Sequence, residues 1–298
     1  DSIQLDGLTD FVGAVTDGLY GAAVFDFKSP HDFVSAKKSW FFFDDEYVCL
    51  GADIHAEGRL PVATTVNQVL LRSDVTVMQN GEVKKMPKGD RELEGVKAVY
   101  QDKVGYIFPE PAKVHLSNQA EQGRWSDITD QKNISKELVT MDVFKLWFNH
   151  GKSPDSASYE YIVVPNVAED AFLNSSKNNR GIEILANNST AQGVMNRKLG
   201  ICQIAFYKAG EVDLSNGMKV RMDNPGMVML KVKDGRVKEL TVSDPLRKSA
   251  KLMVTLSGSY DTKSKHALCV PEKDGKATMI IVDVPQGVYA GKSVSVEL

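Results

Sequence analysis

Two neighbouring residues, Arg124 and Trp125, are the best candidates in this sequence for binding a carbohydrate. A flat apolar ring matches the face of a pyranose, and CH and cation–π contacts add to the attraction. Trp125 follows a glycine in the segment Gln122–Ile128, which indicates a turn, so we expect its ring to be exposed. Trp40 and Trp147 lie inside runs that read as strands, so core packing is the better interpretation for them.

His150 is a third candidate, because it closes an apolar strand in the segment Phe148–Gly151. A turn histidine bonded to the backbone is preferred over catalysis, and carbohydrate binding by His150 is kept as a hypothesis. The histidines form neither H-x-x-H nor H-E-x-x-H, so we expect no zinc site. The acidic triplet Asp44–Glu46 could ligate calcium, but the spacing of an EF-hand is absent and a solvated turn is the simpler prediction. We therefore expect no metal and no cofactor in this segment.

Cysteine chemistry is not expected either. Cys49, Cys202 and Cys269 all lie inside apolar runs, which predicts buried, inert thiols. Three cysteines are too few for a disulfide framework. The sequence also lacks a G-x-S-x-G elbow, a Walker loop and a dinucleotide-binding fingerprint in its proper context.

Composition narrows the class of protein further. The 298 residues carry 36 Lys+Arg against 39 Asp+Glu, a formal net charge of −3, which gives no bulk electrostatic argument for nucleic acid or an anionic membrane. No run approaches 18 apolar residues, so we expect no membrane-spanning helix. The sequence opens at Asp1 without a Met or a leader, which we interpret as a chain that has been processed or is a piece of something longer.

Short runs rich in Val, Ile, Phe, Tyr and Thr recur along the whole chain and predict an all-β fold of stacked antiparallel sheets or a barrel. Examples of the expected strands are Gly21–Phe27, Ser39–Phe43, Tyr47–Ile54, Val62–Leu71, Val75–Gln79, Gly105–Phe108, Val143–Phe148, Tyr159–Val164, Gln203–Tyr207, Met227–Val232, Leu252–Leu256 and Met279–Val284. Asn80-Gly81, Asn216-Gly217 and Asp234-Gly235 are hairpin signals. Helical periodicity is confined to Val167–Ser176 and predicts at most about two turns. The polar cluster Ser175–Gly181 predicts a boundary between a domain over residues 1–178 and a smaller one over 179–298.

Several ordered motifs resemble the central and C-terminal β domains of polysaccharide lyase family 8, the chondroitin AC, hyaluronate and xanthan lyases, with the closest likeness to chondroitin AC lyases. The first is Ala36–Asp44 running into Val48–Ile54; the others match T-T-x-N-Q, G-Y-x-F-P, G-x-W-x-x-I, H-G-x-x-P with Y-x-Y-x-x-x-P, and D-P-[LT]. In this sequence they are Thr64–Gln68, Gly105–Pro109, Gly123–Ile128, His150–Pro154 with Tyr159–Pro165, and Asp244–Leu246. The resemblance covers nearly the whole chain, from about Phe11 to Leu298.

This resemblance implies an antiparallel super-sandwich of the galactose-mutarotase type, truncated at its N-terminus, followed by a smaller C-terminal β-sandwich. It also implies β-elimination at a uronic acid in the parent enzyme, where a base removes the proton next to a neutralised carboxylate and an acid protonates the leaving oxygen. The family carries its catalytic Asn, His, Tyr and Arg on an N-terminal helical domain, so no catalytic residue is carried over to a position here. Calcium is possible in the parent enzyme.

We therefore consider two hypotheses about function, one an enzyme portion and the other a module without catalysis. In the first, this is the C-terminal β portion of an exported bacterial lyase, secreted or periplasmic, that degrades chondroitin sulfate or hyaluronan. Its partners would be the acidic polysaccharide and the helical domain of the same polypeptide, which it would brace while walling the substrate cleft. The segment alone would be inactive. In the second, it is a stand-alone β module that binds carbohydrate or acts as a scaffold without catalysis.

Overall fold

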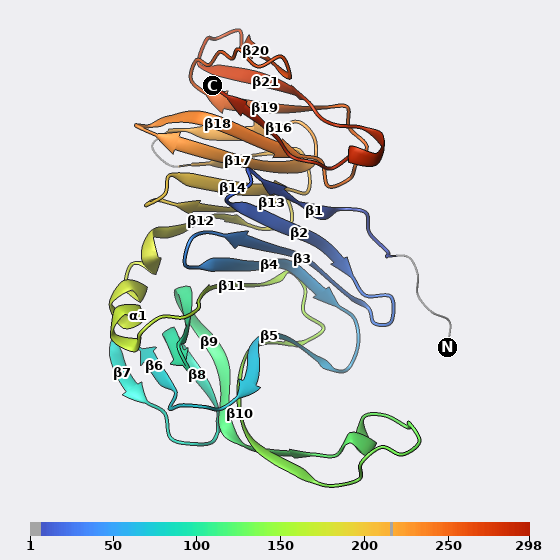
Figure 1. Ribbon diagram of the computed structural model, residues 1–298, viewed down its shortest axis with the longest axis vertical. Coiled ribbons are helices and arrows are strands. Elements are labelled where there is room, and N and C mark those ends of the chain that lie inside the picture. The colour runs from blue at the N-terminus through green and yellow to red at the C-terminus, as the bar shows by residue number, and fades with distance from the viewer. Residues whose placement is uncertain (1–6, 215–216) are drawn as a thin grey trace. The chain divides into compact units, whose positions relative to one another are not determined.

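Antiparallel strands make up most of the chain, as expected, and a computed structural model describes residues 7–214 and 217–298 (Figure 1). Each strand run named in the sequence overlaps a strand of the structure. The chain divides into two compact units. One comprises residues 1–59, 153–163 and 178–298, and the other comprises residues 60–152 and 164–177. The domain boundary expected near Ser175–Gly181 stays a prediction.

The unit built mainly from the two ends of the chain contains a twisted antiparallel sheet and a β-sandwich. The sheet runs in the order β1-β2-β3-β4-β11, with β1 Val12–Thr16, β2 Gly21–Lys28, β3 Val34–Phe42, β4 Tyr47–Ala56 and β11 Ala157–Val164. One layer of the sandwich has the order β12-β13-β14-β17-β18-β22, namely Ile182–Asn187, Ala191–Asn196, Ile201–Phe206, Gly226–Lys233, Arg236–Ser243 and Val294–Glu297. The other has the order β15-β16-β19-β21-β20, namely Gly210–Asp213, Lys219–Met222, Lys251–Ser257, Ala277–Asp283 and Ala267–Pro271.

The core of the sandwich explains why these two layers pack together. Ile204 and Leu230 from one sheet and Val254 and Ile280 from the other are fully buried in one apolar cluster. Alternate residues of a strand point to the same face, so each sheet presents an apolar face to its partner. Burial of such side chains is the main stabilising term for a fold of this kind.

The second unit is a six-stranded antiparallel sheet with one short helix. Its strand order is β5-β10-β9-β8-β6-β7, with β5 Pro61–Leu70, β10 Val139–Lys152, β9 Val104–Gly123, β8 Asp90–Gln101, β6 Thr76–Gln79 and β7 Glu82–Lys85. The helix α1, Glu169–Ser176, confirms the predicted helical stretch. None of the described helices is long and apolar enough to cross a bilayer.

Helix α1 is held by Phe172, whose side chain is fully buried. Its ring lies 5.7 Å from that of Tyr100, between centroids, and directly over the backbone of Gly105. A Cβ at Gly105 would come within 2.0 Å of the Phe172 ring, so only glycine leaves room for it. The helix therefore depends on a glycine of β9 as well as on its own sequence.

Two of the three predicted hairpin turns are confirmed. Asn80 and Gly81 both have positive φ between β6 and β7, as do Asp234 and Gly235 between β17 and β18. Positive φ at both central residues is what a two-residue type I′ turn requires. The third signal, Asn216-Gly217, falls partly outside the described residues.

Asp17 fixes the turn between β1 and β2. Its side chain is almost fully buried, accepts hydrogen bonds from the amides of Leu19 and Tyr20, and pairs with the Lys231 ammonium at 2.8 Å. Burial by itself raises the pKa of this carboxyl, but the hydrogen bonds from Lys231, Leu19 and Tyr20 outweigh it, so the pKa is lowered. Asp17 is therefore charged at neutral pH and ties the turn to β17.

Candidate carbohydrate-binding surface

Arg124 and Trp125 follow β9 directly and begin the loop, residues 124–138, that joins β9 to β10 in a hairpin (Figure 1). The chain leaves β9 at Gly123 and makes a single 3₁₀ turn over Trp125–Asp127 before it returns along β10. Trp125 is 58% exposed, which confirms the expectation drawn from the glycine before it. The hairpin therefore presents the indole and the guanidinium of neighbouring residues to solvent.

A shallow cavity of about 430 Å³ opens beside the Trp125 ring. It is lined by Glu121, Gln122, Gly123, Arg124, Trp125, Ile128, Val139 and Met141. Ile128 and Met141 are more than half exposed, so the floor of the cavity is an apolar surface open to solvent. An apolar floor with a cation at its edge suits the CH face of a sugar ring that carries a carboxylate or sulfate.

His150 lies at the other end of β10, eleven residues along the strand from Val139, or about 36 Å at about 3.3 Å per residue. Its Nε2 is 2.8 Å from the hydroxyl of Thr64 on β5, and its ring stacks on that of Phe148. Burial lowers the pKa of the imidazole, so the ring is neutral at pH 7. The structure therefore brings Arg124 and Trp125 together and leaves His150 apart from them.

The other two tryptophans are half-buried. Trp147 stacks on His115 of the neighbouring strand, with ring centroids 5.0 Å apart, and His115 in turn lies 2.8 Å from Glu92. Trp40 has the Lys38 ammonium 5.8 Å from its ring centre. Both indoles thus have partners within their sheets, in line with the packing role expected of them, although neither is fully buried.

The acidic triplet Asp44–Glu46 is less solvated than expected. Glu46 is buried, and its carboxylate accepts hydrogen bonds from Arg180 Nε at 2.7 Å and from Asn196 Nδ2 at 3.1 Å. Asp44 accepts a hydrogen bond from the hydroxyl of Tyr20. The carboxylates of Asp44 and Glu46 thus bind different partners. In the described ranges no three His, Cys, Asp or Glu side chains gather as metal ligands would. The absence of a cofactor from this segment, and calcium in a parent enzyme, stay predictions.

The expectation of buried thiols is confirmed for Cys49 and Cys202, whereas Cys269 is half-buried. Burial raises the pKa of Cys49 to about 12 and also raises the pKa values of Cys202 and Cys269. A thiol of high pKa carries almost no thiolate at pH 7, so none of the three is suited to nucleophilic chemistry.

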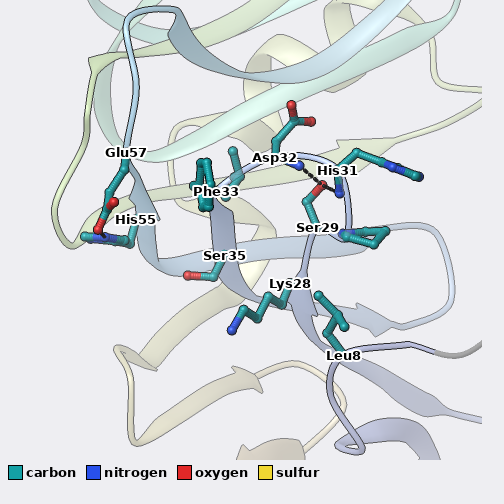
Figure 2. A pocket seen from close by; sticks show the side chains of 11 residues that line it. Leu8, Lys28, Ser29, His31, Asp32, Phe33, Ser35, His55 and Glu57 are labelled. Atoms are coloured by element: carbon teal, nitrogen blue, oxygen red, sulfur yellow. Dashed lines mark hydrogen bonds and ion pairs between the residues drawn. The ribbon is translucent and has the colours of Figure 1, made fainter. Parts of the chain in front are cut away.

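Sequence reasoning did not single out a second cavity, of about 480 Å³, between the β2–β3 loop and the end of β4. Figure 2 shows His55 beside Glu57 on one side of Phe33, with Asp32 and His31 on the other. Phe33 is 78% exposed, and Nδ1 of His55 lies 3.4 Å from the exposed carboxylate of Asp155. The only signal in the sequence was a histidine at the end of the apolar run that forms β4.

The chain matches the family model of the polysaccharide lyase family 8 super-sandwich domain over residues 1–176 and that of its C-terminal beta-sandwich domain over residues 183–253. It is 33% identical to a chondroitinase-AC of Pedobacter heparinus over 98% of this chain. The chain belongs to polysaccharide lyase family 8. The all-β super-sandwich and C-terminal β-sandwich expected from the motifs are thereby confirmed.

Other members of the family are similar over most of the chain. A hyaluronate lyase of Thermasporomyces composti is 29% identical over 82% of it. A solved chondroitinase AC lyase superposes with a TM-score of 0.81 at 33% identity, covering 96% of this chain. The chain spans 39% of the length of the Pedobacter relative and 31% of the Thermasporomyces one.

Proposed function

We propose that these 298 residues are the β portion of a longer bacterial lyase that cleaves a uronate-containing polysaccharide, chondroitin sulfate or hyaluronan, by β-elimination. One observation carries the proposal: the chain is similar from end to end to chondroitinase-AC yet spans 39% of its length. Fold alone does not specify function, but 33% identity over nearly the whole chain supports a shared chemistry in the whole protein.

In this proposal the catalytic acid and base lie outside these residues, and the β portion braces the domain that carries them and walls one side of the cleft. The expected residues of a β-elimination site, a base beside a carboxylate-neutralising group, are not carried over from the family to any position of this chain. The enzyme would be secreted or periplasmic, where its polymeric substrate is accessible. It would bind neither nucleic acid nor a membrane, since the net charge of −3 offers no basic excess.

Within this chain, Arg124 and Trp125 would bind the polysaccharide. The exposed indole offers a stacking surface, and the guanidinium offers a partner for a carboxylate or sulfate. A polyanion needs cations at its binding surface, and because the chain as a whole has none in excess, a local one is required. His150 would belong to a separate contact, since it lies at the far end of β10.

Turnover by the full-length protein with single substitutions tests this assignment. Trp125→Ala and Arg124→Ala should each raise KM about tenfold, the equivalent of 1.4 kcal/mol, and leave kcat nearly unchanged, because they remove binding that is equal in the ground and transition states. Val288→Ala is the matched control, since Val288 is an 87% exposed apolar side chain outside the hairpin. An unchanged KM in both hairpin variants would contradict a role of Arg124 and Trp125 in binding the polysaccharide.

The stand-alone module remains the second candidate, because the open apolar cavity beside Trp125 is itself typical of a carbohydrate-binding surface. Turnover of the polysaccharide distinguishes the stand-alone module from the lyase. A full-length protein that binds the polysaccharide through Trp125 but releases no unsaturated product would favour the module over the lyase.

A further inference from the structure

The outer edge of β5 is the longest uncovered strand edge in residues 7–214 and 217–298. β5 pairs with β10 along one side, and no described strand pairs with the other. Its ten residues, Pro61–Leu70, contain no Asp, Glu, Lys or Arg, and Val69 and Leu70 are 40% and 45% exposed. A long, uncharged edge is a template for pairing with another strand, and proteins normally protect such edges.

Three other sheet edges of this fold have a protection that β5 lacks. The opposite edge of the same sheet, β7, has four residues, of which Glu82, Lys84 and Lys85 are charged. Strand β15 is equally short and has two acidic residues. Strand β1 is uncharged but covered, because its Ala14 carbonyl accepts a hydrogen bond from the Ser243 hydroxyl at 2.8 Å. Short length, charge or cover therefore accounts for each of these three edges, and β5 has none of the three. The bulges in its pairing with β10 lie before Asn67, so the end of the strand from Asn67 to Leu70 is regular.

The register shows which backbone groups of β5 are available. The Leu71 amide donates to the Asp142 carbonyl at 2.9 Å, so this pair is hydrogen-bonded across the strands. Alternate residues of an antiparallel strand point their amide and carbonyl toward opposite neighbours. The amides of Val69 and Asn67 therefore face β10, and those of Leu70 and Gln68 face outward.

We propose that a β-strand from the part of the lyase that this chain does not span pairs along the outer edge of β5. The inference rests on the proposed function in one respect, that a longer polypeptide exists. The Pedobacter relative, of which this chain spans 39%, supports that premise. A strand of the same polypeptide is favoured over a separate partner because a tethered strand is present at a high effective concentration in every molecule. Main-chain hydrogen bonds would supply the affinity, and the exposed side chain of Leu70 would pack against the added strand.

Residue-resolved hydrogen exchange on the full-length protein tests the pairing. The outward amides of Gln68 and Leu70 should exchange at least about 100-fold more slowly than in an unfolded peptide, and so should the inward amides of Asn67 and Val69, which face β10. Light scattering on the same sample should show a monomer. Outward amides that exchange at the unfolded rate while the inward ones are protected would overturn the proposal. Protection found only in a dimer and lost on dilution would also overturn it, in favour of a second copy.

A proline variant adds a second, independent readout. Gln68→Pro removes an amide that faces away from β10, and proline is tolerated in a strand where the missing N–H would face outward. In the full-length protein it should lower Tm and speed exchange at Leu70, whereas Gln68→Ala, which keeps the amide, should do neither. Equal Tm and exchange in both variants would overturn the pairing. Lyase activity of the wild-type protein is scored separately, so a protected edge in an inactive protein would refute the proposed function alone.

Discussion

Replacing Gly105 by alanine tests the packing of α1 on β9. A Cβ at this position would lie 2.0, 2.2 and 2.5 Å from three carbons of the Phe172 ring, whereas carbon atoms pack at about 3.5–4.0 Å. The ring is fully buried against Tyr100 and must shift by more than about 1 Å to accept the methyl group. Overpacking of this kind costs about 1–3 kcal/mol, and we expect Gly105→Ala to lie at the upper end, about 2–3 kcal/mol.

A second substitution shows whether the ring is the cause. Phe172→Leu alone should cost about 1–2 kcal/mol through lost burial. The double variant should lose at least about 1 kcal/mol less unfolding free energy than the two single variants lose in sum, because the smaller side chain vacates the space that the new methyl group needs. Urea unfolding of the wild type, both single variants and the double variant measures all four free energies. A Gly105→Ala loss below about 0.5 kcal/mol, or strictly additive losses, would refute the packing described.

Three further predictions concern backbone strain, thiol reactivity and acid stability. Gly81→Ala should cost about 1 kcal/mol in unfolding free energy because of its φ of +82° alone, since the new Cβ would meet no atom within 4 Å. Gly123→Ala is the control: its site is equally open but has no positive φ, so this variant should be as stable as the wild type or more stable. Equal Tm shifts of the two variants in thermal melts would be inconsistent with this. In the native protein, Cys49 should resist alkylation at pH 8 far longer than Cys269, because burial raises the pKa of Cys49 to about 12 whereas Cys269 is only half-buried. Mass spectrometry measures the two labelling rates, and equal rates would count against the burial described. Because the folded-state pKa of Asp17 is lowered, its stabilisation is present above about pH 4 and is lost as the pH falls through that lowered value. Asp17→Asn should therefore be less stable than the wild type at pH 7 but lose less stability on acidification, and parallel curves of unfolding free energy against pH would contradict this.

The all-β fold and most strand positions could be predicted from the sequence, but the length of β9 could not. The run Gly105–Phe108 was expected to end before Pro109, but β9 continues to Gly123. Two register irregularities in its pairing with β8 accommodate the prolines, and Lys97 Nζ donates to the carbonyls of Phe108 and Pro109. Such an accommodation depends on the neighbouring strand and cannot be read from one segment.

Buried polar residues limited the prediction in a similar way. Strand β13 includes two polar residues, Gln192 and Asn196, and asparagine is depleted in strands, yet both side chains are almost fully buried. Asn196 donates to Glu46, which is distant in sequence, and Gln192 donates to Asn187 and accepts from Tyr207. Tertiary hydrogen bonds therefore stabilise this strand, because they satisfy groups that would otherwise be costly to bury.

The candidate site was predictable only in part. The exposure of Trp125 followed from the glycine before it, because a turn between two strands lies at the surface. The apolar floor beside it did not, since Ile128 and Met141 belong to the turn and to the returning strand and meet only when the hairpin closes. The separation of His150 from Trp125 likewise depends on the length of β10, which was expected as Val143–Phe148 and extends over Val139–Lys152.

The most direct test of the central claim is ultraviolet absorbance of unsaturated uronate during incubation with chondroitin sulfate or hyaluronan. Two samples are compared at equal concentration: the full-length protein and the polypeptide of residues 1–298. The proposed function predicts turnover by the full-length protein and none above background by residues 1–298, because it places the acid and base of the β-elimination outside these residues. Clear turnover by residues 1–298, or a full-length protein inactive on every uronate-containing polysaccharide tested, would contradict it.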